Sequence, residues 1–390
     1  ELANHNTAIR VGVLEQVSTL NAATKFEGIR TYVVKPTATT TYTIVQENID
    51  LNNAGAGTFN VFGYTDSLTV TRTQDDAKLS VIDFGGRLTE NLNPEETIYE
   101  KDVNDIEPVE RHSGFNLVGE TTITIKDLTI QNSLLALSMN NEKSIANISN
   151  VIFSDNITAI INNLGTVTLT NVLVTVGRGA IANDIVNAGT MTLVDSVVES
   201  MIANTSNLVL TSTANNQTEV NEILNQGRLE TRDTILINNL NNENVVVADG
   251  ETTITTLNNG NIDVSGAQFT SQGKKLTIDN ALNYGMITFG GNDDSTNTVN
   301  DVLDNYGVVY VSSLTKVKTL NNYSIGSDTY SGVTSNSTLN IEKLVNGSVD
   351  EDNATITTYG LTTIDDLENY GLLDSYGNIT LGKDSTSSIS

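Results

Sequence analysis

The chain has 390 residues, with 20 Lys and Arg against 47 Asp and Glu and a formal net charge of −27. Such a charge repels polyanions, which excludes DNA and RNA as partners. The chain contains no Cys, so disulfides and thiol chemistry are excluded. This absence favours a bacterial protein that is exported through an oxidising compartment.

No run reaches the roughly 18 apolar residues of a membrane helix. The chain starts with ELANHNTAIR, which lacks the basic and apolar segments of a signal peptide. We therefore expect either a cytosolic chain or one whose leader has been removed, and we favour removal.

Residues 1–115 are predicted to form an N-terminal cap and the first irregular coils. Three stretches rich in Thr, Val and Ile predict strands there, at 41–51, 59–73 and 77–86. A cap would protect the first strand edge.

An acidic loop is predicted at 89–111, with eight acidic residues, two basic ones and two of the three prolines of the chain. We interpret it as a solvated excursion from the fold. The alternative is a partner or Ca²⁺ contact, although the spacing matches no EF-hand or RTX motif, so no cofactor or metal site is predicted. The residues proposed for such a contact are Glu95, Glu96, Asp102 and Asp105.

From residue 116 onward one phrase recurs: an apolar residue, Asn, one further residue and Gly or Ser, followed by an alternating strand. Copies include IVNAGTMTL from Ile185, LNYGMITF from Leu282 and LDNYGVVYV from Leu303. Gly165 and Gly371 are 206 residues apart in ten steps, an average near 21. A repeat of this kind is typical of solenoids.

Within the copies the apolar residues alternate, as in a strand, and do not recur at helical spacing. The Leu spacing of leucine-rich repeats is missing. The sequence therefore predicts an all-β parallel β-helix, or β-solenoid, with coils of about 21 residues that are regular over 116–390. Each coil would bury its inward face only by stacking on its neighbours.

The recurring Asn and Gly are explained by the corner that each coil must turn. Gly and then Asn best tolerate positive φ there. With coils stacked about 4.8 Å apart, equivalent Asn side chains can hydrogen-bond along the axis as a ladder. The residues assigned to this ladder are Asn187, Asn204, Asn225, Asn258, Asn283, Asn305, Asn322, Asn346 and Asn369.

Four copies carry Tyr between Asn and the following Gly or Ser, at Tyr284, Tyr306, Tyr323 and Tyr370. One interpretation is an aromatic ladder that covers the corner. The other is a stacking platform for sugars or a partner, because exposed aromatic side chains are common binding anchors.

GETTITIKDLTIQNS at 119–133, NNLGTVTLTNVLV and IVNAGTMTLVDSVV carry a resemblance over about 115–390. The chain resembles pectate-lyase-like right-handed β-helices and the passenger domains of bacterial autotransporters and polymorphic outer-membrane adhesins. The resemblance implies a right-handed parallel β-helix on a bacterial cell surface or outside the cell. The final ITLGKDSTSSIS predicts no membrane barrel, so anchoring to the outer membrane would require a segment absent from this chain.

Catalysis is not expected. The two His, His5 and His112, and the absent Cys argue against His- or Cys-based active sites. Polyuronate lyases need clustered basic residues, which we do not find, and no Gly-His-Gly signature of polygalacturonase-like hydrolases occurs.

Three functions therefore follow in order of preference. The first is an adhesin that attaches to another cell surface, a host protein or a glycan. The second is a structural subunit of an extracellular filament, sheath or matrix that self-associates. The third is a polysaccharide lyase or hydrolase.

Overall fold

The structure is a computed structural model. It describes the strands at 19–20, 30–34, 40–44, 48–50, 57–61, 67–72 and 80–83, followed by residues 113–117, 120, 122–131, 133–177, 183–292, 294–324, 331–348, 353–382 and 386–387. The chain divides into two compact units, Glu1–Asn207 and Leu208–Ser390.

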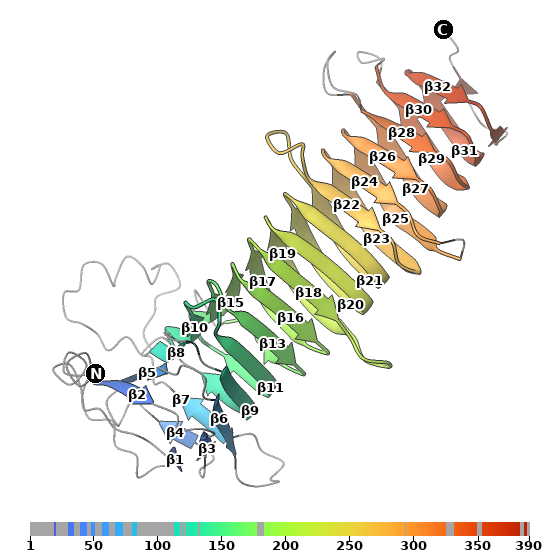
Figure 1. Cartoon of the computed structure of the whole chain (residues 1–390). Coiled ribbons are helices and arrows are strands. Elements are labelled where there is room, and N and C mark those ends of the chain that lie inside the picture. The colour runs from blue at the N-terminus through green and yellow to red at the C-terminus, as the bar shows by residue number, and fades with distance from the viewer. Residues whose placement is uncertain are drawn as a thin grey trace. The chain divides into compact units, whose positions relative to one another are not determined.

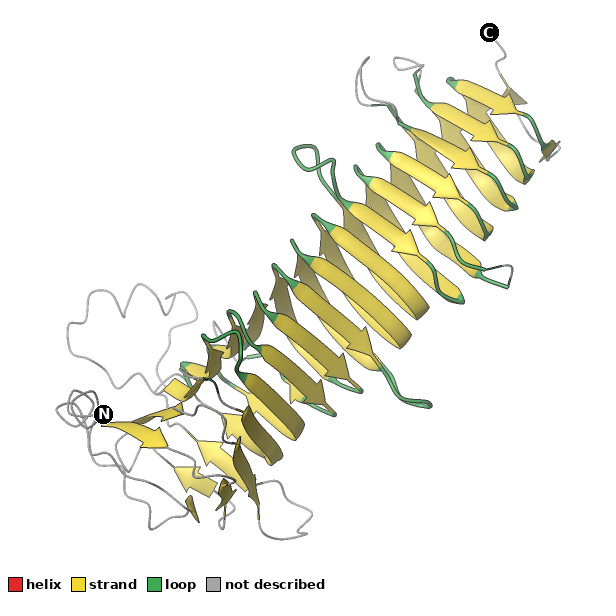
Figure 2. Ribbon diagram, viewed as in Figure 1, coloured by secondary structure: helices red, strands yellow, loops and turns green. Residues whose placement is uncertain are grey.

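The described residues form strands and turns, and no helix occurs among them (Figure 2). Strands of successive coils pair in parallel, so the architecture is a parallel β-solenoid of about 11 turns with coils of about 22 residues (Figure 1). The predicted fold class is confirmed. Since the described part contains no helix, it also contains none that could cross a membrane.

The first unit contains seventeen described strands before the boundary strand. They are β1 (Thr19–Leu20), β2 (Arg30–Val34), β3 (Thr40–Ile44), β4 (Asn48–Asp50), β5 (Gly57–Val61), β6 (Ser67–Arg72), β7 (Ser80–Asp83), β8 (Ser113–Leu117), β9 (Thr122–Gln131), β10 (Leu135–Met139), β11 (Ile145–Ser154), β12 (Thr158–Asn162), β13 (Thr166–Thr170), β14 (Leu173–Val174), β15 (Asp184–Asn187), β16 (Thr190–Val194) and β17 (Val197–Asn204).

The remaining described strands begin with β18, which starts at the last residue of the first unit. They are β18 (Asn207–Thr211), β19 (Thr218–Asn225), β20 (Arg228–Asn242), β21 (Val245–Asn259), β22 (Gln268–Ser271), β23 (Lys275–Asn283), β24 (Met286–Phe289), β25 (Thr296–Asn305), β26 (Val308–Val311), β27 (Leu314–Asn322), β28 (Gly332–Ser335), β29 (Leu339–Asn346), β30 (Thr355–Thr358), β31 (Leu361–Asn369), β32 (Leu372–Ser375), β33 (Asn378–Leu381) and β34 (Thr386–Ser387).

The strands predicted at 41–51, 59–73 and 77–86 are confirmed as β3 and β4, β5 and β6, and β7. They already pair in parallel, since β5 pairs with β8 and β6 pairs with β9. The acidic loop at 89–111, with Glu95, Glu96, Asp102 and Asp105, lies outside the described residues, as do His5 and His112. The N-terminal cap and those contacts remain predictions.

In the second unit a coil is illustrated by β21, whose alternating burial is interrupted at 249–251 and again at 255–256 and so divides it into three strand segments. Burial alternates along β21 on both sides of a corner at Gly250, so that Val246, Ile254 and Leu257 point inward. A short turn after Asn259 then leads toward β22, which pairs with the first part of β21. This alternation is the physical reason that Thr, Val and Ile form strands here.

The interior of each unit is apolar and closely packed. Its largest fully buried side chains are Phe115 and Phe153 in the first unit and Phe269 and Phe289 in the second. Burying a side chain of this size contributes about 1.5–3 kcal/mol. A single coil leaves these residues open above and below, so their burial depends on the neighbouring coils.

Candidate functional site

A row of buried Asn side chains runs along one corner of the second unit. In each coil the Asn side-chain N–H donates to the side-chain oxygen of the Asn in the next coil, and every distance lies between 2.7 and 2.8 Å. The row comprises the buried Asn225, Asn242, Asn259, Asn283, Asn305, Asn322 and Asn346, and ends at the partly exposed Asn369.

The first unit has a row of the same kind. Asn162 donates to Asn187 at 2.9 Å, and Asn187 donates to Asn204 at 2.8 Å. In the preceding coil the equivalent position is held by Met139, which has no amide to pair. The apolar side chain therefore ends the row within the described part of this unit.

The Asn rows also hold each corner together. The side-chain nitrogen of Asn283, besides bonding Asn305, donates to the backbone oxygen of Val308 at 3.2 Å, and Asn259 donates in the same way to Met286 at 3.0 Å. Each of these Asn side chains thus ties the end of a strand in one coil to the start of the strand that follows the turn in the next coil. Buried amides that are hydrogen-bonded in this way rigidify a core and specify its register. The exception is the first described member of the rows, Asn162, whose side-chain oxygen has no hydrogen-bond partner.

Eight of the nine predicted Asn residues lie in these rows, and Asn258 does not. Asn258 is on the outer face of β21, where its side chain donates to Asn241 at 2.8 Å. The buried position belongs to Asn259, because side chains alternate along a strand and Leu257 already points inward. The prediction for Asn258 was wrong by one residue.

Besides Asn259, two further members of the rows, Asn162 and Asn242, were missed. The phrase LNNENVVVADG, which begins at Leu240, has no Gly after its corner, and Asn162 and Asn163 are adjacent. Counting two residues from the inward-facing apolar residue, Ile160 or Leu240, identifies both correctly.

A positive φ angle explains why glycine is needed at some of the corner positions but not at others. Gly260 and Gly347 have φ of 77° and 79°. At Gly285 and Gly307, a Cβ would instead overlap the backbone carbonyl oxygen of the preceding coil, that of Ala267 and Gly285 respectively. Close approach between coils is therefore the second reason for glycine at this corner.

Three predicted tyrosines stack on successive coils beside the Asn row. The ring centroids of Tyr284 and Tyr306 are 5.0 Å apart with planes inclined by 9°, and those of Tyr306 and Tyr323 are 5.2 Å apart with planes inclined by 27°. These distances and angles are those of stacked aromatic pairs. The three rings are partly exposed and are called the tyrosine row below.

Tyr370 is separated from the tyrosine row by one coil. The backbone N–H groups of Tyr323, Gly347 and Tyr370 bond the carbonyls of Asn305, Asn322 and Asn346 in turn. Gly347 therefore occupies the position of a ring in the intervening coil. The Tyr370 hydroxyl donates to Glu368 at 2.6 Å.

Carboxylates lie beside the phenol groups of this corner. The pKa of Tyr323 is raised by burial and by the negative charges of Asp304 and Glu368. The hydrogen bond to Glu368 raises the pKa of Tyr370. Both phenols therefore stay protonated and can donate hydrogen bonds at neutral pH.

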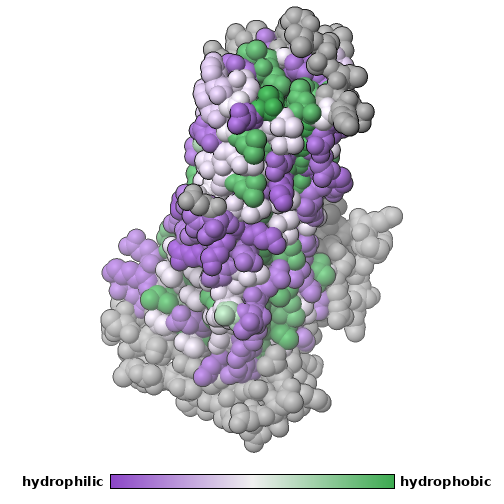
Figure 3. Space-filling model, turned by 90° about the vertical axis from the view of Figure 1, so that its right-hand side faces the viewer, coloured by the Kyte–Doolittle hydropathy of each residue, from purple (hydrophilic) through white to green (hydrophobic). Residues whose placement is uncertain are grey.

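A second tyrosine stack was missed. Tyr359 and Tyr376, 54% and 68% exposed, stack with centroids 5.1 Å apart and planes inclined by 10°. Figure 3 shows hydrophobic residues on one face near the last coils of the second unit, and Leu361 and Leu372 are exposed in this part of the chain. The repeated Tyr-Gly pairs at 359–360 and 376–377 were the available signal.

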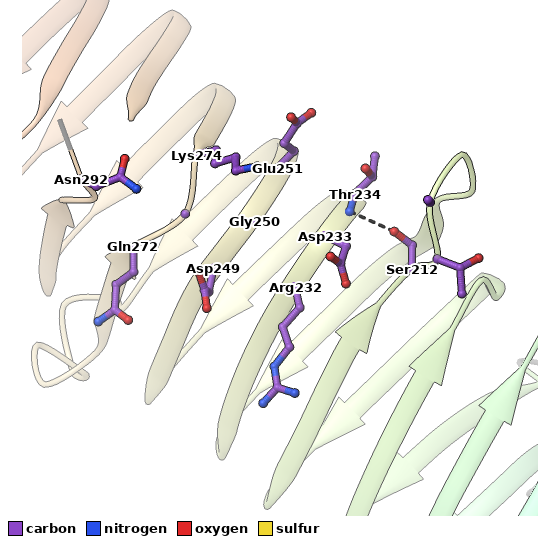
Figure 4. A pocket seen from close by; sticks show the side chains of 13 residues that line it. Ser212, Arg232, Asp233, Thr234, Asp249, Gly250, Glu251, Gln272, Lys274 and Asn292 are labelled. Atoms are coloured by element: carbon purple, nitrogen blue, oxygen red, sulfur yellow. Dashed lines mark hydrogen bonds between the residues drawn. The ribbon is translucent and has the colours of Figure 1, made fainter. Parts of the chain in front are cut away.

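The second unit also contains a trough of about 580 Å³ at the corner between its other strand segments (Figure 4). We call it the corner trough, and the residues that line it are Ser212, Thr213, Ala214, Arg232, Asp233, Thr234, Asp249, Gly250, Glu251, Gln272, Gly273, Lys274 and Asn292. Arg232 pairs with Glu230 at 2.6 Å, and this hydrogen bond lowers the pKa of Glu230. The walls are polar and carry charges of both signs.

The described residues contain no cluster of three or more His, Cys, Asp or Glu side chains that could hold a metal ion. The lining of the corner trough includes neither imidazole nor thiol. Its chemistry is hydrogen bonding and charge pairing.

Fold and site together define the class of protein, a parallel β-solenoid with a buried Asn ladder and stacked surface tyrosines. No protein-family model, curated protein or solved structure matches the chain.

Proposed function

We propose that this protein is a surface-exposed or secreted bacterial attachment protein, in which the tyrosine row contacts a glycan or another surface. The observation that carries the proposal is the stack of Tyr284, Tyr306 and Tyr323 on three successive coils, with partly exposed rings. Tyrosine is suited to such contacts because it presents a large rigid area and a hydroxyl at a low cost in conformational entropy.

The support beneath the row adds to the argument. Asn283, Asn305 and Asn322, each directly before one of the tyrosines, are buried and hydrogen-bonded to one another. The backbone that carries the rings is therefore fixed before a partner binds. Preorganisation of this kind reduces the entropy that binding must overcome.

Charge and composition support an extracellular setting. A net charge of −27 with no Cys suits a soluble domain that passes through an oxidising compartment. The resemblance of the repeats to autotransporter passenger domains supports the same setting.

The test is a binding measurement on glycan arrays and bacterial cells. A variant with Tyr284, Tyr306 and Tyr323 changed to Ser should lose binding while keeping the β-sheet circular dichroism spectrum. The matched control changes the exposed tyrosines Tyr310, Tyr359 and Tyr376 to Ser and should bind like the parent. Equal binding by the first variant and the parent protein would refute the assignment of the tyrosine row.

A further inference from the structure

The corner trough is a second surface of the second unit, built from side chains other than those of the tyrosine row. Its lining comes from successive coils, beginning at the turn of Ser212 and ending at Asn292. Equivalent positions of neighbouring coils lie about 4.8 Å apart, so the trough offers polar groups at a regular spacing. That spacing is close to the length of one sugar residue in an extended chain.

The floor of the trough is bare backbone. Gly250 has φ of 149°, and a Cβ on it would meet the backbone of Asp233 in the preceding coil. A Cβ on Gly273 would in turn meet the backbone of Gly250. Neither position can carry a side chain without a backbone shift, because neighbouring coils approach each other closely at the floor. The side chains of Asp249 and Glu251 project from either side of Gly250 (Figure 4).

The N-terminal end of the trough is held in place by hydrogen bonds. Thr211 donates its hydroxyl to Asp233 at 2.7 Å, and the backbone N–H of Thr234 donates to the Ser212 hydroxyl at 2.9 Å. The Asn292 end is held similarly, because its backbone N–H donates to Ser295 at 2.9 Å. The two ends are therefore preorganised.

The side chains in the middle keep their hydrogen-bonding capacity. They make no side-chain hydrogen bond or ion pair among the described residues, and all are exposed. The two carboxylates only accept hydrogen bonds, the lysine ammonium group only donates them, and the glutamine amide does both. These middle residues are Asp249, Glu251, Gln272 and Lys274.

The charges and polar groups of the corner trough argue against three classes of ligand: polyanions, apolar molecules and peptides that add as a strand. The carboxylates of Asp233, Asp249 and Glu251 and the net charge of −27 oppose a polyanion. An apolar ligand would find one apolar lining side chain, that of Ala214. A peptide that adds as a strand needs an unpaired sheet edge, whereas β21 already pairs with β20, β22 and β23.

We propose that the corner trough binds a segment of an uncharged, hydroxyl-rich polysaccharide. Hydroxyl groups both donate and accept, so they match carboxylates, an amide and an ammonium group presented together. The proposal adds a second contact surface to the attachment function and involves none of the tyrosines of that function.

The experiment is affinity electrophoresis of the purified chain through gels that contain a soluble neutral glucan, mannan or xylan, with polygalacturonate as the anionic comparison. At least one neutral polysaccharide should retard the parent protein, and polygalacturonate should not. The Asp249→Ala, Gln272→Ala double variant should bind about tenfold more weakly, as expected for two lost hydrogen bonds. The matched control, Glu342→Ala with Lys343→Ala, changes exposed residues of β29 and should behave as the parent.

The outcomes separate the two proposals. If the tyrosine variant loses retardation and the trough variant keeps it, the trough proposal is wrong while the attachment function stands. If no neutral polysaccharide retards the parent, or if polygalacturonate retards it equally, the trough proposal is also overturned. Loss in the trough variant alone supports the trough and separates it from the tyrosine row.

Discussion

Asn259 donates its side-chain N–H to Asn283, 24 residues further along the chain, at 2.8 Å. Asn258, its neighbour on the same strand, instead bonds Asn241 on the outer face at 2.8 Å. Two adjacent residues of one type thus make hydrogen bonds of the same length, one inside the solenoid and one outside. Their energetic roles should nevertheless differ.

Asn259→Ala should destabilise the second unit by about 3 kcal/mol, because it leaves buried amide groups of Asn242 and Asn283 without their partner. Asn258→Ala should cost less, about 0.5–1 kcal/mol, because its hydrogen bond to Asn241 is only partly buried on the outer face and water can replace the lost partner. Urea unfolding of both variants measures the difference. If the two variants lost the same free energy of unfolding, the buried Asn row would not be a special source of stability.

Gly307→Ala should cost about 2–3 kcal/mol, because the new methyl group would overlap the carbonyl oxygen of Gly285 and the coils would have to separate. Gly266→Ala is the matched control, since a Cβ there meets nothing within 4 Å. Thermal unfolding of the two variants should place the control close to the parent protein. A tolerated Gly307→Ala would contradict close approach as the reason for this glycine.

Tyr306→Ala should destabilise by about 1–3 kcal/mol beyond its lost burial, because this ring stacks on two others and each stack contributes about 0.5–1.5 kcal/mol. Tyr306→Phe keeps both stacks and should lose less. Tyr370→Ala provides the comparison, since its ring is separated from the row by the coil of Gly347. Denaturant midpoints that fail to rank Tyr306→Ala as the most destabilising would argue against stacking as a source of stability.

Asp184→Asn should raise the stability of the first unit at pH 7. Burial raises the pKa of Asp184, so the folded state penalises its charged form, and asparagine keeps the oxygen that accepts the Met201 N–H at 3.0 Å. The free-energy cost of burying the charged carboxylate is fully present at a pH above the raised pKa of Asp184 in the folded state. It disappears at a pH below the pKa of Asp in the unfolded state, near 3.9. The gain should be small, because the carboxylate is only partly buried.

Unfolding measured between pH 7 and pH 3 tests the assignment for Asp184. The advantage of the variant should shrink as the pH falls and the wild-type carboxyl becomes protonated. An advantage that is the same at both ends of this range would mean that charge burial is not its cause.

Some features followed from local chemistry. Alternation of Val, Leu and Thr with polar residues indicated strands, and the spacing of the Asn-Gly corners indicated coils of about 21 residues where the structure has about 22. The strands rest on the period of two along a strand, which holds within a few residues whatever the fold, and the coil length rests on the spacing of the recurring corner phrase. Asn305 and Asn322 were assigned to the ladder because both stand at the same place in that corner phrase.

Other features depended on which residues of different coils lie opposite each other. Successive ladder residues are 17 apart between Asn242 and Asn259 but 24 apart between Asn259 and Asn283, so the repeat length did not give the register. The isolated Tyr370 and the stacked pair of Tyr359 and Tyr376 were misjudged or missed on this account, whereas Asn258 was misjudged because the inward face of β21 was assigned one residue out. The corner trough could not be predicted from the sequence for the same reason as the tyrosines, because its lining residues come from several coils.

The sequence by itself determined that the chain forms strands and that they wind into repeating coils, because alternation and corner residues act over a few neighbouring positions. Only the tertiary structure decided which side chains meet between coils. Those contacts depend on turn lengths that vary from coil to coil, and on backbone carbonyls that approach glycines from a different coil.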